Sequence, residues 1–344
     1  MSYTFFVGTY ANFLQESILR YTADFESGAF NREASHTGTV NPSWLLLNRS
    51  KRILYSVSET SPAGGLCAFD LSQGEIRTIC RLPSLGADPC HLELSEDGSL
   101  LFISNYSSGT LAVYLLAPSG IPVQLACVRR HTGLSGPGRD FVAQEGPHIH
   151  FSRCLGKTLL ISDLGLDAVF FCRLLSGGAL EDTEPPLRLP DGSGPRHLCL
   201  RADDREWLYV VGELCSQIFV FHREASGYRY RQSLSTLPDG FSGPNICAAV
   251  KWSEDMQHLF VSNRGHDSIA VFAVCRDHLL HKTDICRTGG RMPRDFGVFG
   301  SHLVVANQES RSLNVLAFDP AAGTLRQTSL CEELSAKPVC ILPF

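Results

Sequence analysis

His148, Arg196 and Arg294 each stand directly after a proline, and each of these prolines opens a similar stretch of sequence. Histidine is well suited to take up a proton near neutral pH, and arginine holds phosphate groups and oxyanions through its planar, charged guanidinium. Glu213 and Arg264 directly follow two predicted strands of the same pattern. A histidine, several arginines and a glutamate in one place would suit hydrolysis of an anionic substrate. The strands and loops of the fold must therefore bring these side chains to one place.

A repeat along the whole chain predicts those elements. Seven prolines recur at spacings of 47, 58, 48, 49, 49 and 45 residues, and each precedes a short apolar segment, a turn and a second strand. The prolines are Pro42, Pro89, Pro147, Pro195, Pro244, Pro293 and Pro338. A repeat of this length, rich in short strands and without helical periodicity, predicts an all-β protein, a seven-bladed β-propeller.

The chain ends are expected to share one blade. Six second strands are predicted inside the repeats, at residues 53–58, 101–105, 159–163, 207–212, 259–263 and 303–307. The seventh is expected at residues 5–10, followed by a third strand at 17–21 and a fourth around 32–39, while residues 338–342 form the innermost strand. N-terminal strands that pair with the C-terminal strand would close the ring without unpaired edges. Residues 1–344 are therefore predicted to form a single propeller domain.

Composition argues against several classes of function. A net charge of −5 and a pI near 6.2 provide no bulk attraction to nucleic acid. No apolar run reaches the roughly 18 residues that would span a membrane, and no signal peptide is recognisable. The 13 cysteines are odd in number and form no C-x-x-C pair, which predicts free, buried thiols in a cytoplasmic protein. We expect a monomer or weak homodimer with no cofactor and no metal site.

Blade geometry predicts where the polar residues meet. In each blade the first strand begins, and the second strand ends, at the same face of the ring, so these positions surround one mouth of the channel. The residues after the prolines are Ser43, Cys90, His148, Arg196, Asn245, Arg294 and Val339. The residues after the second strands are Tyr10, Glu59, Tyr106, Leu164, Glu213, Arg264 and Gln308. Among them we expect Arg294, Glu59, Tyr106, Gln308 and Asn245 to bind the substrate.

Three other histidines are assigned from their place along the first strands. His150 lies in an apolar column, so it is expected to be buried with a structural hydrogen bond. His91 and His197 point to the other side of their strands and are expected to hold neighbouring blades together. His91 is also a candidate for the rim of the pocket, and it is included among the substrate-binding residues.

The longest connection between blades, residues 129–145, explains the spacing of 58. Long loops in compact domains are usually functional or disordered. Because this loop leads into the strand that carries His148, it is predicted to lie on the face of the mouth. We expect His131, Arg139 or Gln144 to contact the substrate.

Nine short motifs in one order make a family resemblance specific. They are FVGTY (6–10), NPS (41–43), PCHL (89–92), GPH (146–148), GPRHL (194–198), GEL (212–214), SNRGHDSIAVF (262–272), PRDF (293–296) and VANQ (305–308). In these motifs the chain resembles the bacterial seven-bladed 6-phosphogluconolactonases and their relative, the fungal carboxy-cis,cis-muconate cyclase. The resemblance implies that the catalytic residues are His148, Arg196, Glu213 and Arg264.

The same resemblance implies metal-independent hydrolysis of 6-phospho-D-glucono-1,5-lactone to 6-phosphogluconate, in the pentose phosphate pathway. His148 would be the base, oriented by Glu213, or Glu213 would be the base itself. We expect Arg264 to stabilise the oxyanion and Arg196 to hold the phosphate. The alternatives are a lactonase or lactonising cycloisomerase for another sugar or aromatic-acid lactone and, from a different class, a non-catalytic binding scaffold.

Overall fold

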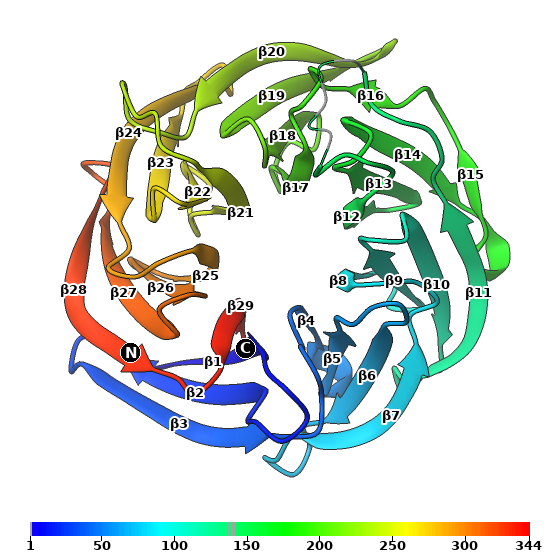
Figure 1. Ribbon diagram of the computed structural model, residues 1–344, viewed down its shortest axis with the longest axis horizontal. Helices are drawn as coiled ribbons and strands as arrows, with labels where there is room; N and C mark the ends of the chain where they lie inside the picture. The colour runs from blue at the N-terminus through cyan, green and yellow to red at the C-terminus, as the bar shows by residue number, and fades with distance from the viewer. Residues whose placement is uncertain (1, 137, 139, 141) are drawn as a thin grey trace.

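Seven antiparallel sheets form a closed ring in the computed structural model, which describes residues 2–136, 138, 140 and 142–344. Figure 1 looks along the axis of the ring, with one sheet per blade and strands such as β8, β25 and β29 nearest the centre. Each blade is a four-stranded sheet, and the fourth blade has an additional short strand. The predicted all-β, seven-bladed propeller is confirmed.

Blade 1 contains strands from both ends of the chain, in the spatial order β29 (Lys337–Pro343), β1 (Ser2–Tyr10), β2 (Ile18–Asp24) and β3 (Ala29–His36). Val7 pairs with Ile341 and Gly8 with Cys340, so the C-terminal strand is innermost and closes the ring as expected. The fourth strand lies three residues earlier than predicted. The chain leaves the sheet after His36 because Gly38 adopts a left-handed conformation with φ of 86°.

The other blades follow one another along the chain, each from the channel outward. Blade 2 comprises β4 (Leu45–Asn48), the 3-10 turn η1 (Arg49–Lys51), β5 (Ile53–Ser58), β6 (Gly65–Asp70) and β7 (Arg77–Pro83). Blade 3 comprises β8 (Pro89–Leu94), β9 (Leu100–Asn105), β10 (Thr110–Leu116) and β11 (Pro122–Arg130). Blade 4 comprises β12 (Ile149–Leu155), β13 (Thr158–Asp163), β14 (Ala168–Leu174), the 3-10 turn η2 (Ser176–Gly178), β15 (Leu180–Asp182) and β16 (Leu187–Arg188).

The remaining three blades have the same plan. Blade 5 comprises β17 (Pro195–Leu200), β18 (Trp207–Gly212), β19 (Gln217–Glu224) and β20 (Gly227–Ser235). Blade 6 comprises β21 (Ile246–Trp252), β22 (His258–Arg264), β23 (Ser268–Val274) and β24 (Leu280–Arg287). Blade 7 comprises β25 (Pro293–Phe299), β26 (His302–Asn307), β27 (Ser312–Asp319) and β28 (Thr324–Glu333).

The core is divided into layers between neighbouring blades. Apolar residues of blade 1, among them Phe5 and Tyr21, pack with Val304 and Val315 of blade 7, and comparable clusters fill the other junctions. The inner strands are therefore almost wholly buried, whereas the outermost strands alternate between half-buried and exposed residues. This distribution explains why the second strands read as continuous apolar runs in the sequence.

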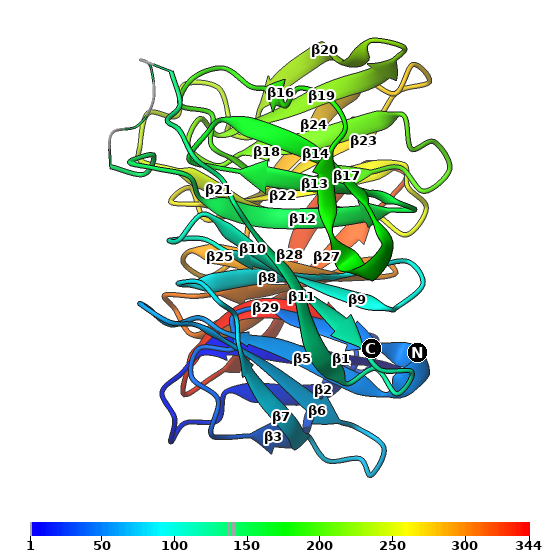
Figure 2. The same cartoon turned by 90° about the vertical axis from the view of Figure 1, so that its right-hand side faces the viewer.

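Strand direction assigns the loops to two faces. Because neighbouring strands are antiparallel, the starts of the first strands, the ends of the second strands and the long loop before β12 share one face. Figure 2 shows this loop on one side of the ring and both chain ends on the other. The face that carries the long loop is called the mouth face below.

Candidate active site

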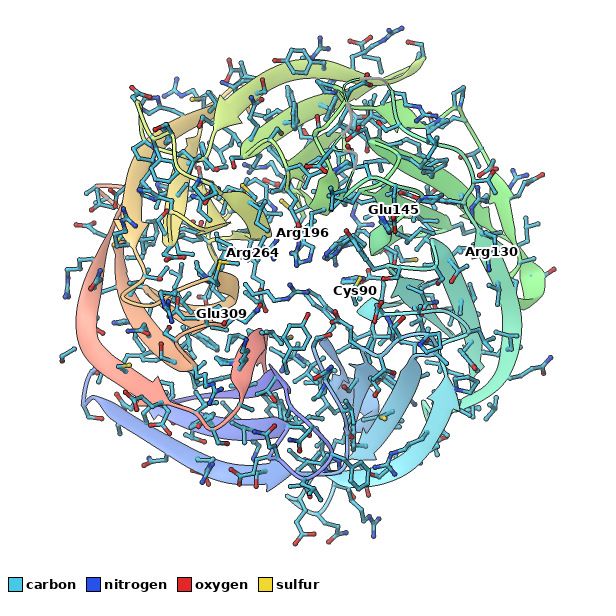
Figure 3. All side chains as sticks on the ribbon, in the orientation of Figure 1. Cys90, Arg130, Glu145, Arg196, Arg264 and Glu309 are labelled. Carbon is cyan, nitrogen blue, oxygen red and sulfur yellow. The ribbon has the colours of Figure 1, made fainter. Side chains whose placement is uncertain are left out.

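Two arginines and one glutamate form the centre of the mouth. Arg196 and Glu213 come from blade 5 and Arg264 from blade 6, and all three lie where the two sequence columns converge. Glu213 Oε2 lies 2.7 Å from Arg196 Nε and 3.0 Å from Arg264 Nη2. Figure 3 shows Arg196, Arg264 and Cys90 around the centre of the ring. One carboxylate therefore serves two guanidinium groups.

The charges in this cluster make Glu213 a poor base. Burial alone would raise the pKa of Glu213, but the guanidinium groups of Arg264, Arg196 and Arg294 outweigh it, and the pKa lies below its usual value. Burial in turn lowers the pKa of Arg196 to about 10, although Glu213 opposes the shift. The glutamate is thus held ionised as a partner of the arginines.

His148 is better placed to accept a proton. Its side chain is stacked on Tyr106 with ring centres 4.4 Å apart, and its Nδ1 lies 3.1 Å from the Tyr106 carbonyl oxygen. A carbonyl oxygen can only accept, so the hydrogen of the neutral ring sits on Nδ1 and the lone pair of Nε2 remains available. The sequence had left two roles open for Glu213, as the group that orients His148 or as the base. The structure orients His148 through Tyr106 instead.

Asp163 secures the backbone of His148 and was missed in the sequence. Its Oδ1 accepts a hydrogen bond of 2.8 Å from the His148 backbone N–H, while Oδ2 lies 2.7 Å from His131 Nδ1. The corresponding residue is Asn105 at the end of β9, Asn263 one residue before the end of β22 and Asn307 at the end of β26, each hydrogen-bonded through its amide. Blade 4 has a carboxylate–histidine pair at this place. The available signal was therefore the one charged residue in a column of seven otherwise uncharged residues.

The opposite half of the mouth comes from blades 7, 1 and 2. Tyr10 donates its hydroxyl to Glu59 Oε1 over 2.9 Å, and the Ser43 hydroxyl donates to Glu59 Oε2. The guanidinium carbon of Arg294 lies 5.2 Å from the centre of the Tyr10 ring. Burial and the neighbouring Glu59 raise the pKa of Tyr10, so this hydroxyl stays protonated. Glu59, Arg294 and Tyr106 thus lie at the mouth, as expected.

Two predicted substrate-binding residues are committed to contacts with the protein itself. His91 is 1% exposed and packs between Trp44 and Phe151, with ring centres 4.5 and 4.0 Å away. This position deeper in the channel corrects the assignment of His91 to the rim. Asn245 donates to the Ser216 hydroxyl and accepts from the His266 backbone N–H, so its amide serves local structure.

Gln308 occupies an intermediate position on the rim. Its Nε2 donates to Glu309 Oε1 over 2.8 Å, and Glu309 is paired with Lys337. Its Oε1 is buried and has no hydrogen-bond partner in the described part of the chain. A substrate-binding role for Gln308 therefore stays a prediction.

Aromatic and histidine rings fill the channel below the mouth. Trp44 of blade 2 reaches His197 of blade 5 across the axis, with ring centres 5.4 Å apart, and His197 also contacts Phe151 of blade 4. His197 Nε2 lies 3.0 Å from Arg196 Nη1 and can accept its hydrogen. Burial and the nearby arginine lower the pKa of His197 well below the usual range, which keeps this ring neutral.

Cys90 and His150 lie together without forming a nucleophile pair. Cys90 Sγ is 3.8 Å from His150 Nδ1 and 3.4 Å from the His150 carbonyl oxygen. Burial raises the pKa of the Cys90 thiol, and burial with the neighbouring arginines lowers the pKa of His150. Both groups are therefore neutral, whereas thiol catalysis needs a thiolate. His150 is buried with a structural contact, as its position in the apolar column predicted.

The long loop supports the site from behind. His131 is buried against Phe170 and paired with Asp163, and Gln144 is fully buried and donates to the Leu164 carbonyl oxygen over 2.7 Å. These bonds correct the expectation that His131 or Gln144 contacts the substrate. Arg139, the third candidate in this loop, lies outside the described residues.

Within the described ranges, no three His, Cys, Asp or Glu side chains are close enough together to hold a metal ion. No helix in that part of the chain has the length and apolarity to cross a membrane. All the cysteines that the structure describes are free thiols, most of them buried or half-buried.

The fold and the site together define a class of protein: a seven-bladed propeller with a histidine, arginines and carboxylates at one mouth. The family model described as "Lactonase, 7-bladed beta-propeller" matches residues 4–343, and the chain belongs to this family. The protein is therefore a lactone hydrolase.

Similar proteins agree with this assignment along their whole length. The 6-phosphogluconolactonase of Bacillus subtilis is 29% identical over 350 residues, covering 98% of this chain and 97% of that protein. The solved structure of a periplasmic gluconolactonase from Pseudomonas aeruginosa superposes with a TM-score of 0.90 at 30% identity, over 100% of this chain and 99% of that one. A Lactobacillus plantarum protein superposes with a TM-score of 0.91 at 28% identity, over 100% of both chains.

Proposed function

We propose that this lactonase hydrolyses 6-phospho-D-glucono-1,5-lactone to 6-phosphogluconate in the cytoplasm, as a monomer or weak homodimer and without a metal ion. The observation that carries the proposal is His148 Nε2, which has no partner among the described residues, at a mouth with more arginine than carboxylate charge. Arg196, Arg264 and Arg294 face Glu213 and Glu59 there. This excess of positive charge favours an anionic substrate.

The first chemical step is attack by water. His148 Nε2 removes a proton from a water molecule as the water oxygen forms a bond to the lactone carbonyl carbon, and the carbonyl electron pair moves onto its oxygen. Arg264 is held in position at the mouth, where its Nη2 donates to the Cys247 carbonyl oxygen over 2.8 Å. Its remaining N–H groups would stabilise the oxyanion.

The second step opens the ring. The oxyanion re-forms the carbonyl, the bond to the ring oxygen breaks, and the proton on His148 Nε2 passes to that oxygen. The product is a hydroxy acid, and the histidine returns to its neutral form with hydrogen on Nδ1. Glu213 would act throughout by holding Arg196 and Arg264 in place rather than by transferring protons.

A second candidate is an unphosphorylated gluconolactone, because the similar Pseudomonas aeruginosa structure is described as a gluconolactonase. A non-catalytic scaffold is disfavoured by the buried ionisable cluster at the mouth.

The test is hydrolysis of both gluconolactones above their spontaneous rates, with and without excess EDTA. We expect a higher kcat/KM for the phosphorylated lactone and no loss of activity on chelation. Preference for the unphosphorylated lactone would favour the second candidate. Activity abolished by EDTA and restored by calcium would contradict the metal-independent mechanism.

A further inference from the structure

Arg294 differs from the two other arginines of the mouth. Arg196 and Arg264 are both committed to Glu213, and each also contacts a further protein group, His197 and the Cys247 carbonyl oxygen respectively. Within the described residues, Arg294 forms no hydrogen bond and no ion pair, and its nearest defined partner is the face of the Tyr10 ring. Unlike those of Arg196 and Arg264, none of its N–H groups is committed to a described protein group, so all of them remain for a ligand.

Tyr10 provides a fixed support for this guanidinium. The phenol is anchored through its hydroxyl to Glu59, and the second oxygen of Glu59 accepts from Ser43. Both carboxylate oxygens are thus occupied by O–H donors, and Glu59 acts on Arg294 as a nearby charge. A guanidinium over a tyrosine face keeps its edges, which carry the N–H groups, directed outward.

The charge of Arg294 is secure in this environment. Burial alone would lower the pKa of Arg294, but Tyr10, Glu59 and Glu213 outweigh it and the pKa is raised. The influence of Glu213 on Arg294 also shows that the two halves of the mouth face each other. Arg294 comes from blade 7 and His148 from blade 4, so they approach the channel from well-separated directions.

We propose that Arg294, supported by Tyr10, binds a phosphate monoester of the substrate at the end remote from the lactone carbonyl, and so sets the preference for phosphorylated lactones. This inference rests on the proposed function for the identity of the substrate. It assigns to Arg294 the role that the sequence had suggested for Arg196. The reason is that Nε and Nη1 of Arg196 are already used by Glu213 and His197.

The experiment compares Arg294→Met with Arg291→Met, a control that removes an exposed arginine from the loop just before β25. Arg294→Met would lose the hydrogen-bonded ion pair with the substrate phosphate. This loss should lower kcat/KM for the phosphorylated lactone about 10- to 100-fold. The rate for the unphosphorylated lactone should stay unchanged, and Arg291→Met should behave as wild type. Arg294→Lys keeps the positive charge but loses the two-pronged N–H geometry of the guanidinium. Its kcat/KM for the phosphorylated lactone should therefore be intermediate.

Binding of products separates this inference from the proposed function. Calorimetry should show that wild type binds 6-phosphogluconate more tightly than gluconate, and that Arg294→Met removes the difference while thermal unfolding stays cooperative. If no lactone is hydrolysed but this binding pattern holds, the proposed function fails and the phosphate subsite stands. If both lactones lose rate equally in Arg294→Met and Arg294→Lys, or the binding preference survives, the subsite is refuted and the hydrolase remains.

Discussion

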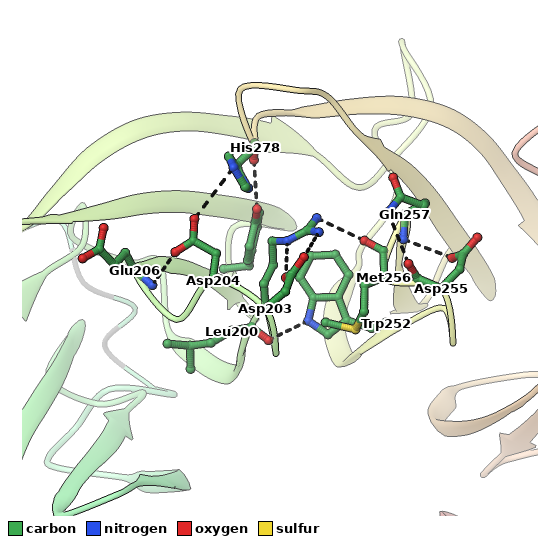
Figure 4. A network of polar contacts seen from close by, with 11 residues as sticks. Leu200, Asp203, Asp204, Glu206, Trp252, Asp255, Met256, Gln257 and His278 are labelled. Carbon is green, nitrogen blue, oxygen red and sulfur yellow. Dashed lines mark hydrogen bonds and ion pairs between the residues drawn. The ribbon is translucent and has the colours of Figure 1, made fainter.

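Two arginine–carboxylate clusters that lie at opposite faces of the molecule are built differently. On the face away from the mouth, Arg201 meets Asp203 in a two-pronged pair with distances of 2.9 and 2.7 Å, and its Nη1 donates to the Met256 carbonyl oxygen over 3.1 Å. The guanidinium carbon also lies 5.8 Å from the centre of the Trp252 ring. Figure 4 shows this network joining the turns of blades 5 and 6. Each charge there has its own partner.

At the mouth, by contrast, two arginines share one carboxylate, and their hydrogen bonding is incomplete. Glu213 serves both Arg196 and Arg264, and the Nε atoms of both arginines are buried without a well-directed hydrogen bond in the described part of the chain. Buried polar atoms are normally satisfied, and exceptions need an explanation. The difference teaches that the Arg201 cluster completes the fold, whereas the mouth cluster holds two buried guanidinium groups on one shared carboxylate at a cost in stability.

The largest expected effect comes from removing His148, the proposed general base at the mouth. His148→Ala should lower kcat about 10²- to 10⁴-fold, the usual contribution of a general base. The thermal unfolding temperature should change little, because the side chain forms one hydrogen bond and one ring stack. Steady-state kinetics with the preferred lactone provide the measurement. A variant with nearly normal kcat would show that His148 at the mouth is not the catalytic base.

Glu213→Gln tests how much the shared carboxylate contributes to stability. Loss of the partner of two buried arginines should lower the free energy of unfolding by about 3 kcal/mol at pH 7. Because the folded pKa of Glu213 is lowered from its usual 4.5, this contribution is present above pH 4.5 and is lost as the pH falls through the folded pKa. Urea denaturation at several pH values should show the two proteins converging in acid. A constant difference would contradict an ionised Glu213.

Asp163→Asn tests the support behind His148. The amide can still accept from the His148 backbone, but the charge opposite His131 is lost. We expect kcat to fall about tenfold through misplacement of the base, with little change in KM. Asn105→Ser, at the equivalent position of blade 3, is the matched control and should leave kcat unchanged. Equal effects of both variants on kcat would mean that Asp163 has only a structural role.

Arg201→Met should have the smallest effect on activity. It removes the paired arginine of the opposite face but keeps much of the packing on Trp252. The free energy of unfolding should fall by about 1 kcal/mol, and kcat/KM should remain that of wild type. Denaturant unfolding and steady-state kinetics on the same preparation check both statements. A clear loss of activity would show that the two faces are coupled.

The fold could be predicted because each blade repeats one local pattern. The second strands at 53–58 and 207–212 have the bounds that the apolar runs predicted, since burial on both faces leaves a continuous signal. The convergence of Arg196, Glu213 and Arg264 followed from counting residues after prolines and strands. These predictions needed only topology.

The finer contacts could not be predicted because the first strands are irregular at their starts. The register shifts between Pro89 and His91 and between Pro195 and Leu198. Simple alternation fails across such bulges, so the buried position of His91, away from the rim, could not be read from its place along the strand. The contacts of His148 with Tyr106 and Asp163 likewise join different strand ends, which no spacing within one repeat reveals.

The pairing of β29 with β1 has a consequence for how the protein could lose activity. Arg294 belongs to blade 7 and Tyr10 to blade 1, so their contact crosses the junction beside the strand pair that closes the ring. Proteins open locally at free energies below that of global unfolding, and chain ends are frequent places for such openings. Separation of β29 from β1 would leave six intact blades and most of the strand content. It would nevertheless free Tyr10 from beneath Arg294, so enzymatic activity would report this opening before spectroscopy could detect it.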